Sequence, residues 1–226
     1  MRGKIFNFLR KPAAVILSIV ITATLISING NIGYFFGLLI VLVFFWSSRF
    51  KGSEFGLNHP QWKPTILKAF LFSMLLFLLV DILIQPFIEI YIGAIDLSAL
   101  DGIRGSFINY LVFILLMWVF AAFGEEFLYR GFFMRRLAIV LGDTNRTWLI
   151  SAFLISIFFG MVHYYQGISG MITTGLIGLC LSLIYFKNRE NLSLLILTHG
   201  IYDMIGITLV YFNKERVITD WIQGML

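Results

Sequence analysis

The sequence predicts an all-α fold, a polytopic transmembrane helix bundle of seven or eight membrane helices with an intramembrane cavity. Hydrophobic residues make up 59% of the 226 residues and charged residues only 13%, about half the charged share of a soluble domain. The apolar residues also fall into runs close to the roughly 20 residues that span a bilayer. Because so few charges could not cover a water-soluble surface, lipid is the expected main solvent.

The chain is expected to form one integral membrane domain over residues 1–226. It has only 4 prolines, and we find no low-complexity tract, linker or internal repeat that would separate modules. The net charge of +5 comes from short basic clusters between apolar runs, which is typical of topology signals. No long basic face exists, so nucleic acid is not an expected partner. Cys180 is the only cysteine, which excludes intramolecular disulfides and a four-cysteine zinc site.

Two helices are expected first. From Pro12 to Ser48 no Asp, Glu, Lys or Arg occurs, and Asn29–Asn31 divides this stretch. The run Ala13–Ile28 follows basic residues and could imitate a signal peptide, but no convincing small-residue cleavage site follows. We therefore expect it to be a retained helix, with the second helix beginning at Ile32.

A third helix is expected from about Ile66 to Ile92, with a possible bend at Pro86. Asp81 and Gln85 share one face of it and could line the cavity, although a hydrogen bond between helices is the simpler interpretation. The preceding polar loop contains His59, which we do not expect to take part in a site.

The remaining helices follow an acidic loop at Asp96–Gly105. Phe107–Phe123 is a fourth apolar helix, and the amphipathic segment Glu125–Leu141 is ambiguous between a helical loop and a further span. The last three expected helices are Trp148–Val162, Ile168–Phe186 and Leu192–Phe212.

Charge in the loops predicts the orientation. With seven spans and a cytoplasmic N-terminus, the loops Arg49–Lys63, Arg130–Arg146 and Lys187–Glu190 face inward, and all three are basic. The outer loops, at Asn29–Asn31, Asp96–Gly105 and Tyr164–Gly167, contain Arg104 as their one base. We expect an integral protein of the cell membrane.

The seven-span topology creates a difficulty, because it places Glu125 at the inner end of one helix and His163 at the outer end of another. Counting Glu125–Leu141 as an eighth span brings the two together but fits the charge rule less well. Both alternatives stay open.

The first candidate chemical motif is Glu125-Glu126-Phe127-Leu128-Tyr129-Arg130, directly after an apolar helix. In a helix, Glu126 and Arg130 lie four residues apart and can pair, while Glu125 points about 100° away. One carboxylate is then neutralised, and the other is free to act as a general base. The alternative is an interfacial ion cluster that ends a helix.

Two histidine motifs complete the set. His163 ends the run Phe159-Gly160-Met161-Val162-His163, and it could simply lie at the lipid interface. His199 and Asp203 share a helix face, either as a pair that holds helices together or as a carboxylate that orients a histidine. Together these side chains could bind zinc through nitrogen and oxygen. They could equally hold water against a carboxylate base, with histidine donors facing an oxyanion.

The three motifs Glu-Glu-x-x-x-Arg, Phe-x-x-x-His and His-x-x-x-Asn/Asp resemble those of the CPBP intramembrane proteases, the CAAX-processing and bacteriocin-immunity protease family. Arg130-Gly131-Phe132-Phe133 continues the first motif as the family does. The resemblance covers roughly Ala121–Asp203, and implies a catalytic core at about 107–212 preceded by N-terminal membrane helices within 1–100, where no family motif is found. The family often has Asn where Asp203 stands, and the added charge makes metal ligation more plausible and an amide oxyanion donor less so.

The resemblance implies an intramembrane endopeptidase that acts on a membrane-associated or lipidated peptide or protein. It implies Glu125 as the base that activates water, supported by Glu126 and Arg130. His163, His199 and Asp203 would hold the water or the oxyanion, or with Glu125 would bind Zn²⁺ or another divalent metal. A metal-free glutamate mechanism is the alternative.

Two non-enzymatic functions remain alternatives. One is a membrane protein that acts by binding, as an immunity factor or scaffold. The other is a small ion-coupled transporter that uses Glu125, Asp203 and the histidines as a cation path. Because all the expected catalytic side chains are present, the sequence favours the enzyme.

Overall fold

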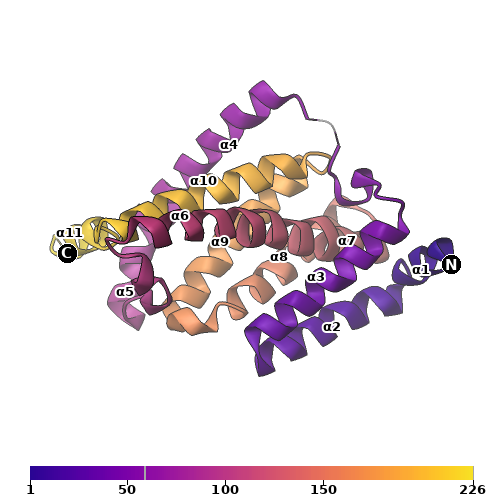
Figure 1. Ribbon diagram of the computed structural model, residues 1–226, viewed down its shortest axis with the longest axis horizontal. Helices are drawn as coiled ribbons and strands as arrows, with labels where there is room; N and C mark the ends of the chain where they lie inside the picture. The colour runs from indigo at the N-terminus through magenta and orange to yellow at the C-terminus, as the bar shows by residue number, and fades with distance from the viewer. Residues whose placement is uncertain (59, 226) are drawn as a thin grey trace.

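The computed structural model describes residues 1–58 and 60–225, so the expectation for His59 lies outside the described residues. Within them, 83% of the chain is helical and no strand forms. The predicted all-α membrane helix bundle is therefore confirmed. The helices run between two ends of the molecule, and the N- and C-termini lie at opposite ends (Figure 1).

The chain opens with a helical hairpin. The short helix α1 (Arg2–Leu9) is bent by 76° from α2 (Pro12–Ile28), which turns back into α3 (Gly30–Ser47). The Asn29 side chain accepts a hydrogen bond from the Ile32 backbone N–H at 3.1 Å, which caps the new helix. The predicted division at Asn29–Asn31 is thus present and has a local cause.

One continuous helix of 31 residues follows. It comprises α4 (Trp62–Leu76), a π-helical stretch η2 (Phe77–Ile84) and α5 (Gln85–Ile92). The π-helical stretch ends at Ile84, two residues before Pro86, where the sequence predicts a bend. π-Helical turns occur frequently at functional sites.

The segment Phe107–Val140 is a single helix of 34 residues, which we call the long helix. It comprises α6 (Phe107–Leu116), the π-helical η4 (Met117–Met134) and α7 (Arg135–Val140). The expectation that Glu125 ends a helix is therefore wrong, and Glu125–Leu141 is neither a loop nor an eighth span. The charges do not end the helix because Glu126 and Arg130 neutralise each other inside the bundle.

The length of this helix resolves the sequence-level difficulty. At 1.5 Å per residue it reaches about 51 Å, against roughly 30 Å of hydrocarbon in a bilayer. Glu125 lies near the middle of the helix rather than at one end. It can therefore share a depth with side chains from the ends of shorter helices.

The last helices are α8 (Asn145–Met161), α9 (Gly167–Lys187), α10 (Leu192–Tyr211) and the unpredicted α11 (Val217–Gln223). Among the described residues, five helices are long and apolar enough to cross a membrane, or six if α1 and α2 form one span. The helix α8 is apolar but shorter. The expected count of seven or eight spans is therefore not confirmed. Short 3₁₀ turns connect several helices, at Gly52–Phe55, Ser98–Ile103 and Tyr164–Gln166.

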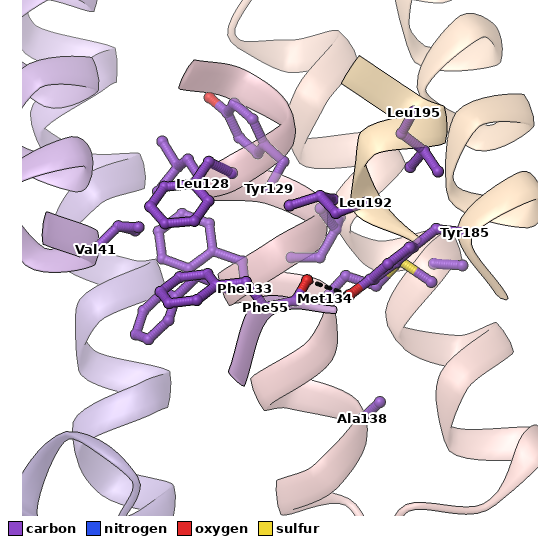
Figure 2. Packing of buried hydrophobic residues seen from close by; sticks show 14 of the residues in the cluster. Val41, Phe55, Leu128, Tyr129, Phe133, Met134, Ala138, Tyr185, Leu192 and Leu195 are labelled. Atoms are coloured by element: carbon purple, nitrogen blue, oxygen red, sulfur yellow. Dashed lines mark hydrogen bonds between the residues drawn. The ribbon is translucent and has the colours of Figure 1, made fainter. Parts of the chain in front are cut away.

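The hydrophobic core surrounds the second half of the long helix (Figure 2). Phe55 stacks on Phe127 with ring centroids 4.1 Å apart, and both rings are buried. The Tyr185 hydroxyl donates to the Phe55 carbonyl at 2.7 Å (Figure 2). Large apolar side chains elsewhere face outward, for example Ile108 at 74% exposure, which suits a lipid-facing surface.

The loops gather at two ends, as the charge pattern predicts. At one end, which we call the basic end, Leu57 pairs with Asn191 and Arg135 donates to the Arg189 carbonyl at 2.8 Å. The predicted basic loop Arg130–Arg146 is the exception, because the long helix continues to Val140 and α8 begins at Asn145. Arg130 itself lies inside the bundle. The opposite end is held by backbone hydrogen bonds from Asp96 to Gln166 and from Gly105 to Tyr211, both at 3.0 Å.

Candidate active site

A buried ion pair lies at the centre of the site. Arg130 Nη1 donates to Glu126 Oε1 at 2.8 Å, and both side chains are fully buried. The same guanidinium donates from Nη2 to the Gly178 carbonyl at 2.9 Å and lies 4.4 Å above the Phe159 ring. The predicted pairing of Glu126 with Arg130 is therefore present, and a second helix, α9, holds it.

Gly178 is required for this approach. A Cβ atom at this position would lie 2.9 Å from the Phe159 ring and 3.2 Å from Arg130 Nη2. Any larger residue would push the ring or the guanidinium out of place, because real Cβ contacts are almost never so short. The small residue on α9 thus allows the arginine of the long helix to reach a backbone carbonyl.

His199 connects the ion pair to a second carboxylate. Its Nδ1 lies 2.9 Å from Glu126 Oε1, and its Nε2 lies 3.4 Å from Asp203 Oδ2. The predicted shared face of His199 and Asp203 on α10 is present. A ring with protons on both nitrogens can donate to both carboxylates, so the imidazole is held from two sides.

His163 is oriented by its own helix. Its Nδ1 lies 2.7 Å from the Phe159 carbonyl oxygen, which can only accept a hydrogen bond, so Nδ1 carries the proton. The neutral ring then has its lone pair on Nε2. Its ring centroid is 4.9 Å from that of Phe159, and Phe159 in turn lies 6.3 Å from His199.

A cavity of about 600 Å³ brings the candidate residues together. Glu125, His163, His199 and Asp203 all line it, although they come from two separate helices and a turn. Glu126 and Arg130 lie behind this wall and support it. The cavity is large enough for several side chains of a peptide. The structure thus joins motifs that are up to 78 residues apart in the sequence.

Tyr34 is a site residue that the sequence analysis missed. It lines the cavity from α3, and its hydroxyl donates to the Phe120 carbonyl at 2.6 Å. A Cβ at Gly124 would lie 2.2 Å from the Tyr34 hydroxyl, so the tyrosine packs on the backbone directly before Glu125. A lone polar ring in an apolar helix was the available signal, but nothing in the sequence paired it with a helix 86 residues later.

Asp81 also lines the cavity, together with Gln85. The Tyr202 hydroxyl donates to Asp81 Oδ2 at 2.8 Å, so η2 is tied to α10 next to His199 and Asp203. Both sequence interpretations hold for Asp81, because it packs two helices and faces the cavity. The Gln85 side-chain amide donates to Glu89 Oε1 on the same helix at 2.9 Å.

The sequence left open a metal site at these side chains, and the need for a metal stays a prediction. Among the described residues, no group of three or more His, Cys, Asp or Glu side chains is placed to hold a metal ion. His199 Nδ1 is within hydrogen-bond distance of Glu126, whereas its Nε2 has only the longer contact with Asp203.

Comparison with known proteins adds one finding. Residues 107–205 match the family model of the Type II CAAX prenyl endopeptidase Rce1-like proteins. No curated protein and no solved structure matches the chain. The matched region contains all six candidate residues, from Glu125 in the long helix to Asp203 in α10, and leaves α1–α5 outside.

Proposed function

We propose, from the match of residues 107–205 to the family model of the Rce1-like Type II CAAX prenyl endopeptidases, that the chain hydrolyses a peptide bond within the membrane by means of water activated by Glu125. The observation that carries the proposal is the shared cavity, which Glu125, His163, His199 and Asp203 all line. The family supports an intramembrane endopeptidase. The substrate we propose is a membrane-associated or lipidated peptide or protein.

The first step is the attack of water. The Glu125 carboxylate takes one proton from a water molecule, and the water oxygen forms a bond to the carbonyl carbon of the scissile peptide. The carbonyl oxygen becomes an oxyanion. Glu125 then gives its proton to the leaving nitrogen as the carbon–nitrogen bond breaks, which releases an amine and a carboxylic acid. Positioned proton transfer of this kind contributes about 10²- to 10⁴-fold in rate.

The two histidines have different roles in this proposal. The His163 lone pair on Nε2 accepts the second hydrogen of the water and orients its oxygen towards the substrate. His199 donates from Nε2 to the developing oxyanion, since its contact with Asp203 is long at 3.4 Å. Asp203 keeps the ring in place between catalytic steps.

Glu126 and Arg130 position the other groups and do not react. Glu126 Oε1 accepts hydrogen bonds from both Arg130 and His199. Its charge is therefore compensated, and the second bond holds the imidazole in place. Arg130 anchors this carboxylate to α9 through the Gly178 carbonyl. Preorganised groups of this kind matter because a displacement of about 1 Å can cost 100-fold in rate.

The proposal predicts that Glu125→Gln abolishes cleavage while the protein still folds. Peptides that accumulate uncut would be compared by mass spectrometry in membranes that contain the original chain or the variant. We expect a loss of about 10²- to 10⁴-fold in processing, the contribution of a general base.

A matched control is Glu190→Gln, which removes a carboxylate that is 58% exposed at the basic end. This control should process peptides normally. Wild-type processing by Glu125→Gln, at equal protein amount, would refute the proposed base. Treatment with a chelator should leave activity intact if no metal takes part.

A further inference from the structure

The cavity occupies only one half of the bundle. Among the described residues, the lining side chains of the long helix end at Glu125, and those of α10 begin at His199. The lining of α9 stops at Ile177. Each helix thus contributes the half that points towards the loops at Gly93–Ser106 and the C-terminal turn.

The other half of the bundle is closed. Directly beyond Glu125 the long helix buries Leu128, Phe132 and Phe133, and α10 buries Leu192 and Leu195 before it reaches His199. All five side chains have no exposed surface, and several of them are drawn in Figure 2. Among the described residues, this packed core separates the cavity from the basic end.

The cavity extends to the end of the bundle opposite the basic loops, and we call this part of it the mouth. Ile95, Leu97 and Leu100 line it from the loop before α6, and Ile218 and Thr219 line it from α11. In Figure 1 this end carries the C-terminus, while the N-terminus lies at the other end.

Charge separates the two ends strongly. The chain has 17 Lys and Arg residues. The end that carries the mouth holds Arg104, Lys214 and Arg216, Arg130 lies inside the bundle, and the others lie at the basic end or in α4 near it. Cytoplasmic loops carry the excess of Lys and Arg in membrane proteins, so the basic end faces the cytoplasm and the mouth faces away from it.

We infer that the site receives its substrate from the extracytoplasmic side, as a peptide segment that is neutral or positively charged. This inference rests on the proposed function for the reaction, but the direction of access follows from the position of the cavity and the charge of the two ends. Extracytoplasmic access favours peptides exposed outside the cytoplasm as substrates over tails that remain in the cytoplasm.

The charge preference follows from the lining. Four carboxylates line the cavity, those of Asp81, Glu125, Asp203 and Glu215, and no Lys or Arg in the described part of the chain does. Arg104 and Arg216 lie at the same end in salt bridges with Glu215 and Glu89, and His199 lies beside Asp203. Among the described lining residues Asp81 and Glu125 have no such cation partner, so the lining carries a net negative charge. A cavity with a net negative charge attracts positive charge and rejects negative charge.

Thiol labelling in intact cells tests the direction of access. In a Cys180→Ala background, Ile95→Cys places a thiol at the mouth and Lys51→Cys places a matched thiol at the basic end. We expect a membrane-impermeant maleimide to label Ile95→Cys in intact cells, and Lys51→Cys only after the cells are lysed. Labelling of Lys51→Cys from outside, with Ile95→Cys protected until lysis, would overturn the inference.

Peptide protection tests the charge preference with the same variant. An apolar peptide that carries two lysines should slow the labelling of Ile95→Cys several-fold, whereas the same peptide with two aspartates should not. Equal protection by both peptides would overturn the preference. Neither measurement needs turnover, so a failure of Glu125 to act as the base would leave these results unchanged and would be recognised separately.

Discussion

Replacing Glu126 by glutamine should destabilise the protein far more than removing a surface carboxylate from a similar pair. Glu126 and Arg130 are both fully buried and lie 2.8 Å apart. Glutamine keeps the shape of the side chain but removes its charge, so the guanidinium would stay buried without a counter-charge. Breaking a buried pair in this way costs about 3–5 kcal/mol.

The lower end of this range is expected here. The glutamine oxygen can still accept a hydrogen bond from Arg130, and the Gly178 carbonyl continues to accept another. We therefore expect a loss of about 3 kcal/mol in the free energy of unfolding, which is about a hundredfold in the folding equilibrium. The matched control is Glu190→Gln in the exposed pair with Arg135 at 2.9 Å, where the loss should be below about 1 kcal/mol.

The assay is reversible unfolding of the purified protein in mixed micelles, followed by circular dichroism. A double variant, Glu126→Gln with Arg130→Met, should recover much of the lost stability, because it no longer buries an unpaired charge. The reasoning would be refuted if Glu126→Gln cost no more than Glu190→Gln, or if the double variant lost the sum of the two single changes.

Two further predictions concern close packing around the site. Gly178→Ala should lower activity and cost about 1–3 kcal/mol by overpacking, whereas Gly175→Ala on the same helix meets only ordinary contacts at 3.6 Å and should be neutral or stabilising. Equal behaviour of the two variants in thermal unfolding would contradict this account. Tyr34→Phe should lower kcat more than it raises KM, because Tyr34 packs beside Glu125, while Tyr110→Phe, whose hydroxyl pairs with Thr208 at 3.0 Å, should leave kcat unchanged. A wild-type kcat for Tyr34→Phe would show that its hydroxyl does not position the base.

Apolar runs and local spacing were sufficient to predict most of the helices and two contacts of the site. The break at Asn29–Asn31 depends on a cap formed within one short turn. The pairing of Glu126 with Arg130 depends on residues one helical turn apart. Such features follow from helical periodicity, which a single sequence displays directly. The same holds for the shared face of His199 and Asp203.

Features that depend on contacts between distant helices could not be predicted. Glu125 was assigned to a helix end because charged residues normally leave the membrane. Glu126 instead neutralises Arg130 within the long helix, and contacts from α9 and α10 hold this pair inside the bundle. The contact between His199 and Glu126 spans 73 residues, and no spacing rule predicts it. The role of Tyr34 likewise depends on how the hairpin of α2 and α3 packs against the long helix.

The hydrogen bond from Tyr34 to the Phe120 carbonyl has a practical consequence for protein engineering. A fragment limited to residues 107–205, where the family match lies, would leave this carbonyl and the flank of Gly124 bare to detergent. The Tyr202 hydroxyl would also lose its hydrogen-bond acceptor, Asp81. Minimal versions of the protein intended for expression or screening should therefore retain the first hairpin and the helix Trp62–Ile92, although neither carries a recognisable motif.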